Sequence, residues 1–567
     1  MEDGRRPLAD PKEKYDVALV GAHLATNLLA AVLAKSGVRV LLVDAEADAA
    51  VPAGETTVPY TAEVFFTLAR RYDIPEIGAF GLTCDLPDRV RRTSGVKRSL
   101  SFLYHRSGKE QDPAQTVQFN VPGEHSEWHM FRPDVDEHAH EIARQYGAVV
   151  PRHRSVLATT GPLPGGDGVE VTTADGVRYR ARYLVDSVGM DSPIVAKLGG
   201  PEPVAGLRTR SRVMSAHLKG VRQFEDEVSQ SAYPGASPWS VGTISHLFDG
   251  GWIQVAHFDN HPEAGTARTS VTASVDPDRY GDLPKDPEAG FRALIERFPQ
   301  LAATFETAVA ATPWTGDALW QRTVAQTVGP RHFLFERSAA RNDMFLSRDV
   351  TMAAELVYAL APVLIRAART DDWSPARFAP VAAFQRELTA FNDRILAAAR
   401  VATGDFRLWN PFSRVWLLWS MLAALSLKSA RNHALGNGDW SPTQRMDEGA
   451  FWFALPRGLP ELLERTFEWT EQVRAGQISA AGAADRIWQA LREAKFKPPL
   501  YGFADPADRY YHFTPVKRLK AMVWTRTVAP PEFRSMLTKE NLTSTPPSAA
   551  ASTGGSHRRS KRTGSDR

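Results

Sequence analysis

Cysteine is almost absent from this sequence, since Cys84 is the only one in 567 residues. The chain therefore cannot form an internal disulfide bond or a metal site built from several thiolates. The charged start of the chain lacks the apolar core of a signal peptide. The longest apolar run that stands out, 415–427, is shorter than the ~20 residues of a membrane-spanning helix. We expect a cytoplasmic protein without a transmembrane segment, in which 415–427 forms a buried or interfacial helix.

A large excess of charge of one sign is also missing. The formal net charge is +3, and much of the basic excess lies in the last residues, so the body of the chain is close to neutral. This distribution gives no electrostatic basis for binding nucleic acid. No metal site is expected, because His138 and His140 would lie on different faces of one helix. The sequence contains no Walker-type phosphate loop and no nucleophile-elbow motif.

The chain does contain distinct regions of secondary structure. From residue 15 the pattern reads strand, helix, strand, and Gly37 stands where a helix C-cap glycine belongs. Two buried strands joined by one helix predict a parallel crossover. Short alternating runs over about 96–323, such as 98–104 and 168–174, predict a larger antiparallel sheet. The predicted fold class is α/β (α+β): a Rossmann-like βαβ module, an inserted, mostly antiparallel β-sheet region and a helical C-terminal part.

The turn after the first strand carries a degraded dinucleotide motif. A pyrophosphate needs a tight turn, a close backbone approach and a helix N-terminus, which the pattern G-x-G-x-x-G usually supplies. Gly21 keeps the first glycine, whereas His23 and Thr26 replace the second and third, with Ala25 before Thr26. Asp44 ends the second strand, where a carboxylate can accept hydrogen bonds from ribose hydroxyls. Taken alone, the unit is equally compatible with a βαβ fold that binds no ligand.

Later segments resemble, in their order and spacing, motifs of the flavin-dependent halogenases, a branch of the FAD monooxygenases. With the βαβ unit they cover about residues 15–401. The segments are GETTVP (54–59), GVKRSL (95–100), FRPDVD (131–136), VDSVGMDS (185–192), GGWIQVAHF (250–258), AARNDMFLS (339–347) and DWSPARF (372–378).

This resemblance implies a cofactor, a chemistry and partners. In the family, reduced FAD reacts with oxygen to a hydroperoxide, halide attacks it, and the hypohalous acid passes to a lysine near an aromatic substrate. A separate flavin reductase is implied, because the sequence has no second glycine-rich unit for a nicotinamide. The implied division is a disordered tail at 1–14, an FAD-binding domain at 15–380 with its substrate sheet at about 96–323, a helical region at 381–537 and a disordered basic tail at 538–567.

The resemblance also assigns three catalytic positions. Lys97 matches the active-site lysine, whose desolvated ammonium can hydrogen-bond the oxidant, or whose amine of lowered pKa can form a haloamine. The alternative for Lys97 is a solvated surface lysine. Trp252 matches a tryptophan of the family's tunnel segment, and its alternative is a core aromatic. Ser347 stands where the family's peptide approaches the reactive edge of the flavin.

The cofactor-binding positions follow in the same way. Arg132 would face the phosphate or ribose, or instead form an ion pair with Asp136 one helical turn on. Glu55 would line the cofactor cleft, or simply be an acid stabilised at a helix N-terminus. Asp186 and Gly189 would form the strand-to-turn transition beside the flavin, or an ordinary turn. The full predicted set is Gly21, His23, Ala25, Thr26, Asp44, Glu55, Thr57, Arg132, Asp186, Gly189 and Asp343.

The sequence departs from the family pattern in two places. Gln254, Ala256 and His257 replace the second tryptophan, the isoleucine and the proline of the tunnel segment, and Arg-Asp at 348–349 replaces a small residue and glycine. Leu346 stands where halogenases of free tryptophan carry a glutamate. We therefore expect a phenol, a pyrrole, or a carrier- or peptide-bound aromatic as substrate rather than free tryptophan.

Three functions remain open at this point. The first is a halogenase that uses reduced FAD, oxygen and halide in secondary metabolism. The second, favoured by the altered tunnel segment, is a flavin hydroxylase or oxidoreductase that does not halogenate. The third, favoured by the lost glycines of the nucleotide turn, is a flavin-fold protein that only binds a partner.

Overall fold

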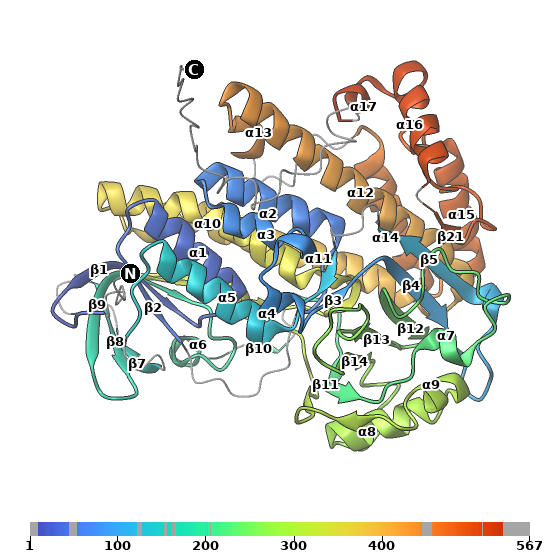
Figure 1. Cartoon of the computed structure of the whole chain (residues 1–567), viewed down its shortest axis with the longest axis horizontal. Helices are drawn as coiled ribbons and strands as arrows, with labels where there is room; N and C mark the ends of the chain where they lie inside the picture. The colour runs from blue at the N-terminus through green and yellow to red at the C-terminus, as the bar shows by residue number, and fades with distance from the viewer. Residues whose placement is uncertain are drawn as a thin grey trace, which may run out of the picture.

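The computed structural model describes residues 9–44, 54–121, 127–151, 156–160, 163, 166, 168–198, 200, 202–203, 206–444, 456–512 and 514–536. Figure 1 shows one sheet at the N-terminal end of the molecule, a second sheet at the other end, and long helices that run between them. The predicted C-terminal tail and residues 1–8 of the predicted N-terminal tail lie outside the described residues.

The first sheet contains the predicted βαβ unit. Strand β1 (Lys14–Val20) pairs in parallel with β2 (Val40–Val43) on one side and with β9 (Arg178–Asp186) on the other, and helix α1 (Leu24–Lys35) connects β1 to β2. β1 is almost continuously apolar because both faces of a parallel sheet are covered. The other strands of this sheet are β7 (Val156–Thr160), β8 (Val169–Thr173), β18 (Val328–Gly329) and β19 (His332–Leu334).

Helices cover the first sheet and bring distant segments to it. α5 (Arg132–Gln145) and α10 (Asp349–Thr370) both pack against α1. Val17 and Leu19 of β1 belong to the same apolar cluster as these helices, whereas Ala18 and Val20 face a second cluster on the opposite side. The N-terminus of α1 therefore lies among segments from the middle of the chain.

The second sheet is mostly antiparallel, as the alternating runs predicted. Its strand order is β15-β11-β14-β13-β12-β4-β5-β21, with β16 also paired to β11, and its one parallel pair among the long strands is β12 with β4. The run at 168–174 was expected here, but it forms β8 and pairs with β9 in the first sheet. The strands are β4 (Ser99–Tyr104), β5 (Thr116–Asn120), β11 (Arg212–Lys219), β12 (Thr243–Phe248), β13 (Gly251–His257), β14 (Thr269–Val275), β15 (Val309–Ala310), β16 (Thr315–Asp317) and β21 (Tyr510–Tyr511).

Both faces of the second sheet are buried, each against different helices. Trp252 of β13 and Phe102 of β4 point to the C-terminal helices, whereas Ile253 and Leu103 point to α8 (Pro287–Ile295) and α9 (Pro299–Thr304). This alternation follows from the period of two along a strand. The side that carries Trp252 is the side that faces the long helices from the end of the chain.

The C-terminal part is helical and closes over the second sheet. Its long helices lie side by side in Figure 1, and the short strand β21 inserts its main chain next to β5. The helices are α11 (Pro375–Ala402), α12 (Phe406–Asn437), α13 (Ser441–Gln444), α14 (Leu459–Arg474), α15 (Ala480–Glu493), α16 (Pro515–Thr527) and α17 (Pro531–Met536).

Shorter elements complete the described chain. They are α2 (Pro59–Tyr72), α3 (Pro75–Ala79), α4 (Asp88–Arg91), α6 (Pro193–Lys197), α7 (Phe224–Glu227), β3 (Gly95–Val96), β6 (Trp128–His129), β10 (Glu202–Pro203), β17 (Arg322–Thr323), β20 (Ala340–Arg341), and the 3-10 turns η1 (Thr83–Asp85), η2 (Pro113–Gln115), η4 (Glu336–Ser338) and η5 (Phe345–Ser347).

One helix in the described part of the chain is long and apolar enough to cross a membrane by these two criteria alone. The stretch Phe345–Thr370 has the length and composition of a membrane span, but 72% of its most apolar window is buried inside the protein, as in a core helix. The run at 415–427, which stood out in the sequence, is also mostly buried, as part of α12.

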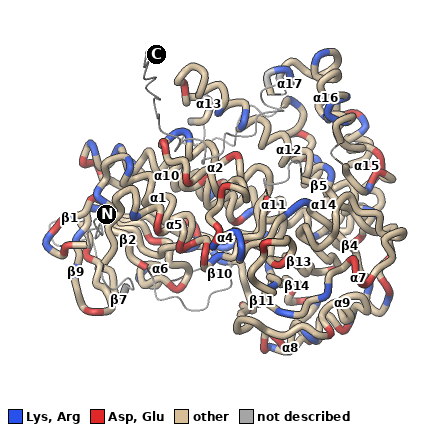
Figure 2. Tube along the Cα trace, viewed as in Figure 1, with Lys and Arg blue, Asp and Glu red and all other residues tan. Residues whose placement is uncertain are grey.

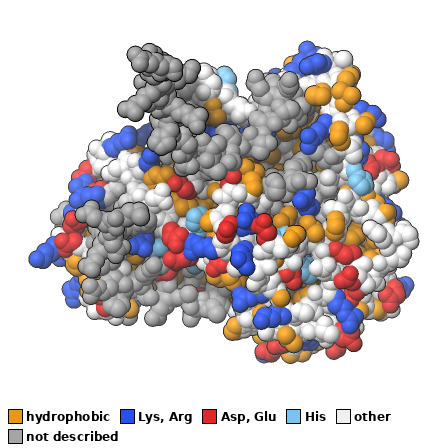
Figure 3. Space-filling model, viewed as in Figure 1, with side chains coloured by type: hydrophobic (Ala, Val, Ile, Leu, Met, Phe, Trp, Pro, Cys, Tyr) orange, Lys and Arg blue, Asp and Glu red, His pale blue; other side chains and the backbone are white. Residues whose placement is uncertain are grey.

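The surface carries charges of both signs. Figure 2 shows lysine and arginine interspersed with aspartate and glutamate along the whole tube, in agreement with the small net charge. Figure 3 shows apolar side chains at the end of the molecule where Figure 1 labels α16, and Val516, Leu519 and Val523 of that helix are 62, 58 and 55% exposed.

Candidate cofactor and active site

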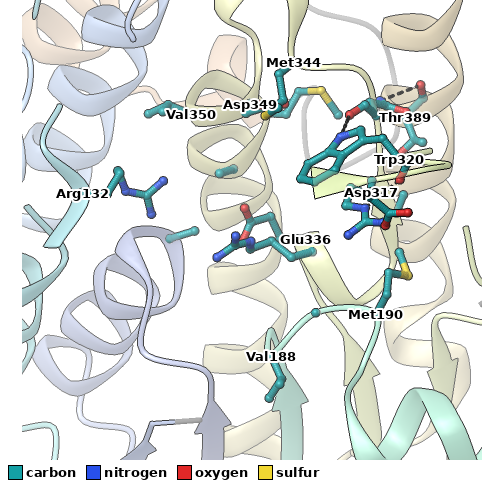
Figure 4. A pocket seen from close by; sticks show the side chains of 18 of the residues that line it. Arg132, Val188, Met190, Asp317, Trp320, Glu336, Met344, Asp349, Val350 and Thr389 are labelled. Atoms are coloured by element: carbon teal, nitrogen blue, oxygen red, sulfur yellow. Dashed lines mark hydrogen bonds and ion pairs between the residues drawn. The ribbon is translucent and has the colours of Figure 1, made fainter. Parts of the chain in front are cut away.

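A cavity of about 560 Å³ lies between the first sheet, the start of α10 and the edge of the second sheet. This volume is within the range of small-molecule sites. Figure 4 shows Arg132, Glu336 and Asp349 around its middle, and Trp320 and Met344 toward one side. The cavity therefore lies between the first sheet and the second, mostly antiparallel sheet.

The turn before α1 keeps the one glycine that its geometry requires. Gly21 has a φ of +93°, and a Cβ there would lie 2.7 Å from the carbonyl carbon of Ser187 in the turn after β9. Leu24 and Ala25 begin α1 and line the cavity. At Gly21 the turn after β1 lies close to the turn after β9, and the start of α1 lies at the cavity.

Three other residues of the predicted nucleotide motif lie outside the cavity lining. His23 is the N-cap residue of α1, and burial together with Arg337 and Arg132 lowers the pKa of its imidazole to about 2. Thr26 is fully buried in α1, and Asp44 is half-buried after β2. His23 is therefore uncharged at neutral pH, and the contribution of these three residues to cofactor binding stays a prediction.

Asp186 organises the turn that follows β9. Its Oδ1 accepts hydrogen bonds from the amide of Val188 at 3.0 Å and from the hydroxyl of Ser338 at 2.7 Å. The same serine oxygen accepts the amide of Gly189 at 2.8 Å. Gly189 has a φ of +126° and lines the cavity, so Asp186 holds in place a turn whose glycine faces the candidate cofactor.

Arg132 forms the predicted ion pair and also lines the cavity, and its contact with phosphate or ribose stays a prediction. Its Nη2 donates to Asp136 Oδ1 at 2.9 Å and to Oδ2 at 3.2 Å, which forms a two-pronged ion pair one helical turn apart. Arg132 also lines the cavity. Asp136 Oδ1 accepts the amide of Leu24 at 3.0 Å, so this carboxylate caps the N-terminus of α1 as well.

Two acids face the cavity that are not among the predicted cofactor residues. Glu336 accepts a hydrogen bond from Ser187 at 3.2 Å, and burial raises the pKa of its carboxyl group. Asp349 is the first residue of α10, and burial, with the negative charges of Glu336 and Asp343, raises its pKa to about 7. The cavity thus combines Arg132 with two carboxyl groups whose pKa values are raised.

The predicted segment 54–57 joins the cavity wall to the interior. Glu55 accepts hydrogen bonds from Nε2 of His217 at 2.9 and 3.1 Å, and both side chains are buried. The hydroxyl of Thr56 donates to that of Ser347, a contact that no sequence pattern indicated. His217 on β11 is a residue that the sequence interpretation missed, because nothing in the local sequence connects residues 55 and 217.

Lys97 is a buried lysine and not a surface one. Its exposed fraction is 2%, and its Nζ donates a hydrogen bond to the carbonyl oxygen of Thr57. Burial lowers the pKa of its ammonium to about 8, and the neighbouring Glu127 partly opposes this effect. The lysine and Ser347 are therefore attached to adjacent residues, Thr57 and Thr56.

The segment 343–349, which we call the strap, leads into α10. Leu346 and Ser347 both have left-handed backbones, with φ of +65° and +57°, which is rare for residues with side chains. Trp252 stacks on Phe345 of the strap with ring centroids 5.2 Å apart and planes 15° apart, and Trp409 of α12 packs against the same ring. Trp252 is thus a buried aromatic that supports the strap next to Ser347.

Asp343 lies at the start of the strap but outside the cavity lining. Its Oδ2 accepts hydrogen bonds from Ser211 at 2.6 Å and Ser274 at 3.0 Å, and it pairs with Arg400 at 3.1 Å. The side chain therefore connects two strands of the second sheet to α11. Its predicted contact with the cofactor stays a prediction.

Comparison with known proteins identifies the family to which this chain belongs. No family model matches the sequence. The chain is 31% identical over 529 residues to tetracycline 7-halogenase of Kitasatospora aureofaciens, across 92% of this chain and 95% of that protein. It is 30% identical over 534 residues to monodechloroaminopyrrolnitrin halogenase PrnC of Pseudomonas fluorescens, across 92% of this chain and 93% of the relative. The chain belongs to the flavin-dependent halogenases.

Solved structures agree with this flavin-dependent halogenase assignment. Halogenase PltM in complex with phloroglucinol and FAD matches with a TM-score of 0.80 and 27% identity, over 88% of this chain and 99% of that one. CmlS, a flavin-dependent halogenase, matches with a TM-score of 0.51 and 16% identity over 85% of this chain and 78% of that one, which concerns the fold alone. The predicted family, the α/β fold, the FAD cofactor and the oxidoreductase class are confirmed.

Proposed function

We propose that this halogenase modifies an electron-rich phenolic ring, with FAD bound in the cavity and Lys97 beside the substrate. The phenol is suggested by relatives, since one is a tetracycline halogenase and PltM was solved with phloroglucinol. A carrier- or peptide-bound phenol is compatible with the same chemistry. A separate reductase would deliver the reduced flavin.

The residues around the cavity fit FAD. Gly21 allows the two strand-end turns to approach closely, and Leu24 and Ala25 present the first turn of α1, where phosphates bind favourably. Arg132 supplies a cation near that helix end, and Gly189 exposes backbone toward the same space. Reduced FAD bound here would activate oxygen, which is the oxidant of the reaction.

The single observation that carries the proposal is the pair of bonds made by Thr56 and Thr57. Thr56 holds Ser347 of the strap, which borders the cavity through Met344 and Asp349, and Thr57 holds the ammonium of Lys97. A buried lysine is thereby held at the residue next to the one that holds the strap.

Each residue then has a physical role. Lys97, removed from water, can donate a strong hydrogen bond to a hypohalous acid or, when neutral, accept the halogen. Trp252 and Phe345 keep the strap dry and in place, which limits loss of the oxidant to solvent. Asp186 fixes the turn that carries Gly189 against the cofactor.

The test is an assay of the purified protein with FAD, a flavin reductase, a nicotinamide, chloride or bromide, and phloroglucinol as the probe substrate. We expect a halogenated product by mass spectrometry. Lys97→Ala should remove this product by at least ~100-fold while FAD still binds, because the lysine lies outside the cavity lining. Halogenation at the wild-type rate by Lys97→Ala would contradict the assignment.

One observation favours a second outcome. Asp349 puts a carboxyl group at the start of α10 where the family pattern has a glycine, and its anion would repel halide. If the same assay yields a product heavier by one oxygen atom and independent of halide, the enzyme is a hydroxylase.

A further inference from the structure

Lys97 lies opposite a buried glutamate that no sequence motif singled out. Strands β3 and β6 pair antiparallel, with Gly95 opposite His129 and Val96 opposite Trp128. The amide of Lys97 donates to the carbonyl oxygen of Glu127 at 3.1 Å, which continues this register by one residue. Residues directly opposite in an antiparallel pair have neighbouring side chains.

Glu127 is as deeply buried as Lys97. Its exposed fraction is 1%, and among the described residues only the hydroxyl group of Thr57 is near enough to affect the pKa of its carboxyl group as a hydrogen-bond donor, without good bonding geometry. A buried carboxylate without such partners is costly, unless it is neutral or balanced by a nearby cation. Lys97 is the cation that acts on it most strongly.

The electrostatics of the two groups are matched. Burial raises the pKa of the Glu127 carboxyl group to about 8 against the opposing effect of Lys97, and burial lowers the pKa of the Lys97 ammonium to about 8. Two interacting groups with similar pKa values titrate as a coupled pair, so a change in one changes the protonation of the other.

Few other charged groups act on this pair. On β6, His129 is neutral, because burial lowers its pKa to about 3. On α2, Glu63 opposes ionisation of Glu127, but Glu63 is itself paired with Arg431 of α12. The protonation of Lys97 is therefore determined chiefly by its burial and by Glu127.

We propose that Glu127 is a positioning residue for the reaction: its charge, on the strand opposite Lys97, sets the form in which the lysine meets the oxidant. This inference rests on the proposed role of Lys97. Glu127 acts through Lys97 and need not touch the substrate, because it lies on the opposite strand.

The direct test is an NMR titration of the protein labelled with ¹³C at the lysine ε-carbons, with the Lys97 resonance identified by its absence in Lys97→Met. In the wild type we expect the Lys97 resonance to titrate near pH 8. In Glu127→Gln the anion that favours the ammonium is removed, so the Lys97 pKa should fall by about one pH unit or more. Glu127→Met, which places no polar atom in the buried site, should give the same shift if the glutamine variant folds poorly.

Glu355 provides a matched control. It is fully buried on α10 and its pKa is also raised to about 8, but its neighbours are Arg348 and Tyr60. Glu355→Gln should leave the Lys97 titration where it is in the wild type. An unchanged Lys97 pKa in both Glu127 variants, or an equal shift in Glu355→Gln, would overturn the proposal.

The pH dependence of halogenation gives the second readout. The limb of the kcat profile that reports Lys97 should move to lower pH by the same amount in Glu127→Gln, a change that a purely structural role would not produce. If the NMR shift occurs but the wild type halogenates nothing, the coupling of Glu127 to Lys97 stands and the proposed function fails. If halogenation occurs and the Lys97 pKa is unmoved, the function stands and the role of Glu127 is wrong.

Discussion

The hydroxyl group of Thr56 donates a hydrogen bond to the hydroxyl group of Ser347, although 291 residues separate them in sequence. Both side chains are buried. The bond attaches segment 54–57 to the strap at the residue where the backbone is left-handed. A strained backbone persists only where its surroundings hold it, and Thr56 is one of the groups that hold Ser347.

Thr56→Val should therefore loosen the strap. Valine keeps the shape of threonine but leaves the hydroxyl of Ser347 buried without this donor, which costs about 1–3 kcal/mol of unfolding free energy. We also expect halogenation to fall more than stability alone explains, because Thr56 holds the strap next to Thr57, the residue that holds Lys97. Urea unfolding and product formation by mass spectrometry measure the two effects.

Thr61→Val is the matched control for Thr56→Val. Thr61 and Thr351 share a buried hydroxyl–hydroxyl bond of 2.7 Å between α2 and the first turn of α10, and the Thr61 hydroxyl also accepts the amide of Val58 at 3.2 Å. The control should lose at least as much stability and keep its rate per folded molecule, because it leaves the Thr56–Ser347 bond in place. Equal losses of rate in the two variants would argue against a specific role for the Thr56–Ser347 bond.

Asp349 should make FAD binding depend on pH. Its pKa of about 7 in the folded protein is above the ordinary value of 3.8. Between about pH 4 and pH 7 this carboxyl group is ionised in the unfolded chain but protonated in the folded apoprotein. The unfolding free energy of the apoprotein therefore falls as the pH rises through this range. Above pH 7 the carboxylate would be a buried anion in the cavity proposed for FAD, which is itself an anion, and affinity should fall roughly 3- to 10-fold. Asp349→Asn should abolish this fall and bind FAD more tightly at high pH. Fluorescence titrations of FAD on either side of pH 7 test this.

Asp191 supplies the comparison for Asp349. It also lines the cavity but is exposed, so water screens its charge. Asp191→Asn should leave the pH midpoint of FAD binding in place. A midpoint that survives in Asp349→Asn would assign the titration to another group, of which Glu336 is the nearest in the cavity.

The sequence predicted the βαβ unit, the antiparallel sheet and the family because these depend on local periodicity and on short motifs. Lys97 and Arg132 were named as site residues from the same short motifs, and their roles stay predictions. The pairing of Lys97 with Glu127, and of Glu55 with His217, could not be predicted, because both depend on which distant strands lie side by side. The run at 168–174 was assigned to the wrong sheet, since alternation shows that a strand exists but not which partner it has.

Gly21→Ala should be far more damaging than one added methyl group suggests. The new Cβ would lie 2.7 Å from the carbonyl carbon and 2.8 Å from the carbonyl oxygen of Ser187, which are main-chain atoms that cannot turn aside, and φ is +93°. We expect a loss of about 2–4 kcal/mol in unfolding free energy and, in the folded fraction, weaker FAD binding, because the turn after β9 must move. Gly37→Ala is the control, since its φ is +84° but nothing lies within 4 Å of its Cβ position, so only the backbone strain of about 1 kcal/mol remains. Thermal melts with and without FAD separate the effect of the close contact from the effect of the backbone conformation. Equal losses of stability in the two variants would mean that backbone conformation alone requires Gly21. A larger loss in Gly21→Ala would mean that the contact between the two strand-end turns builds the cofactor site.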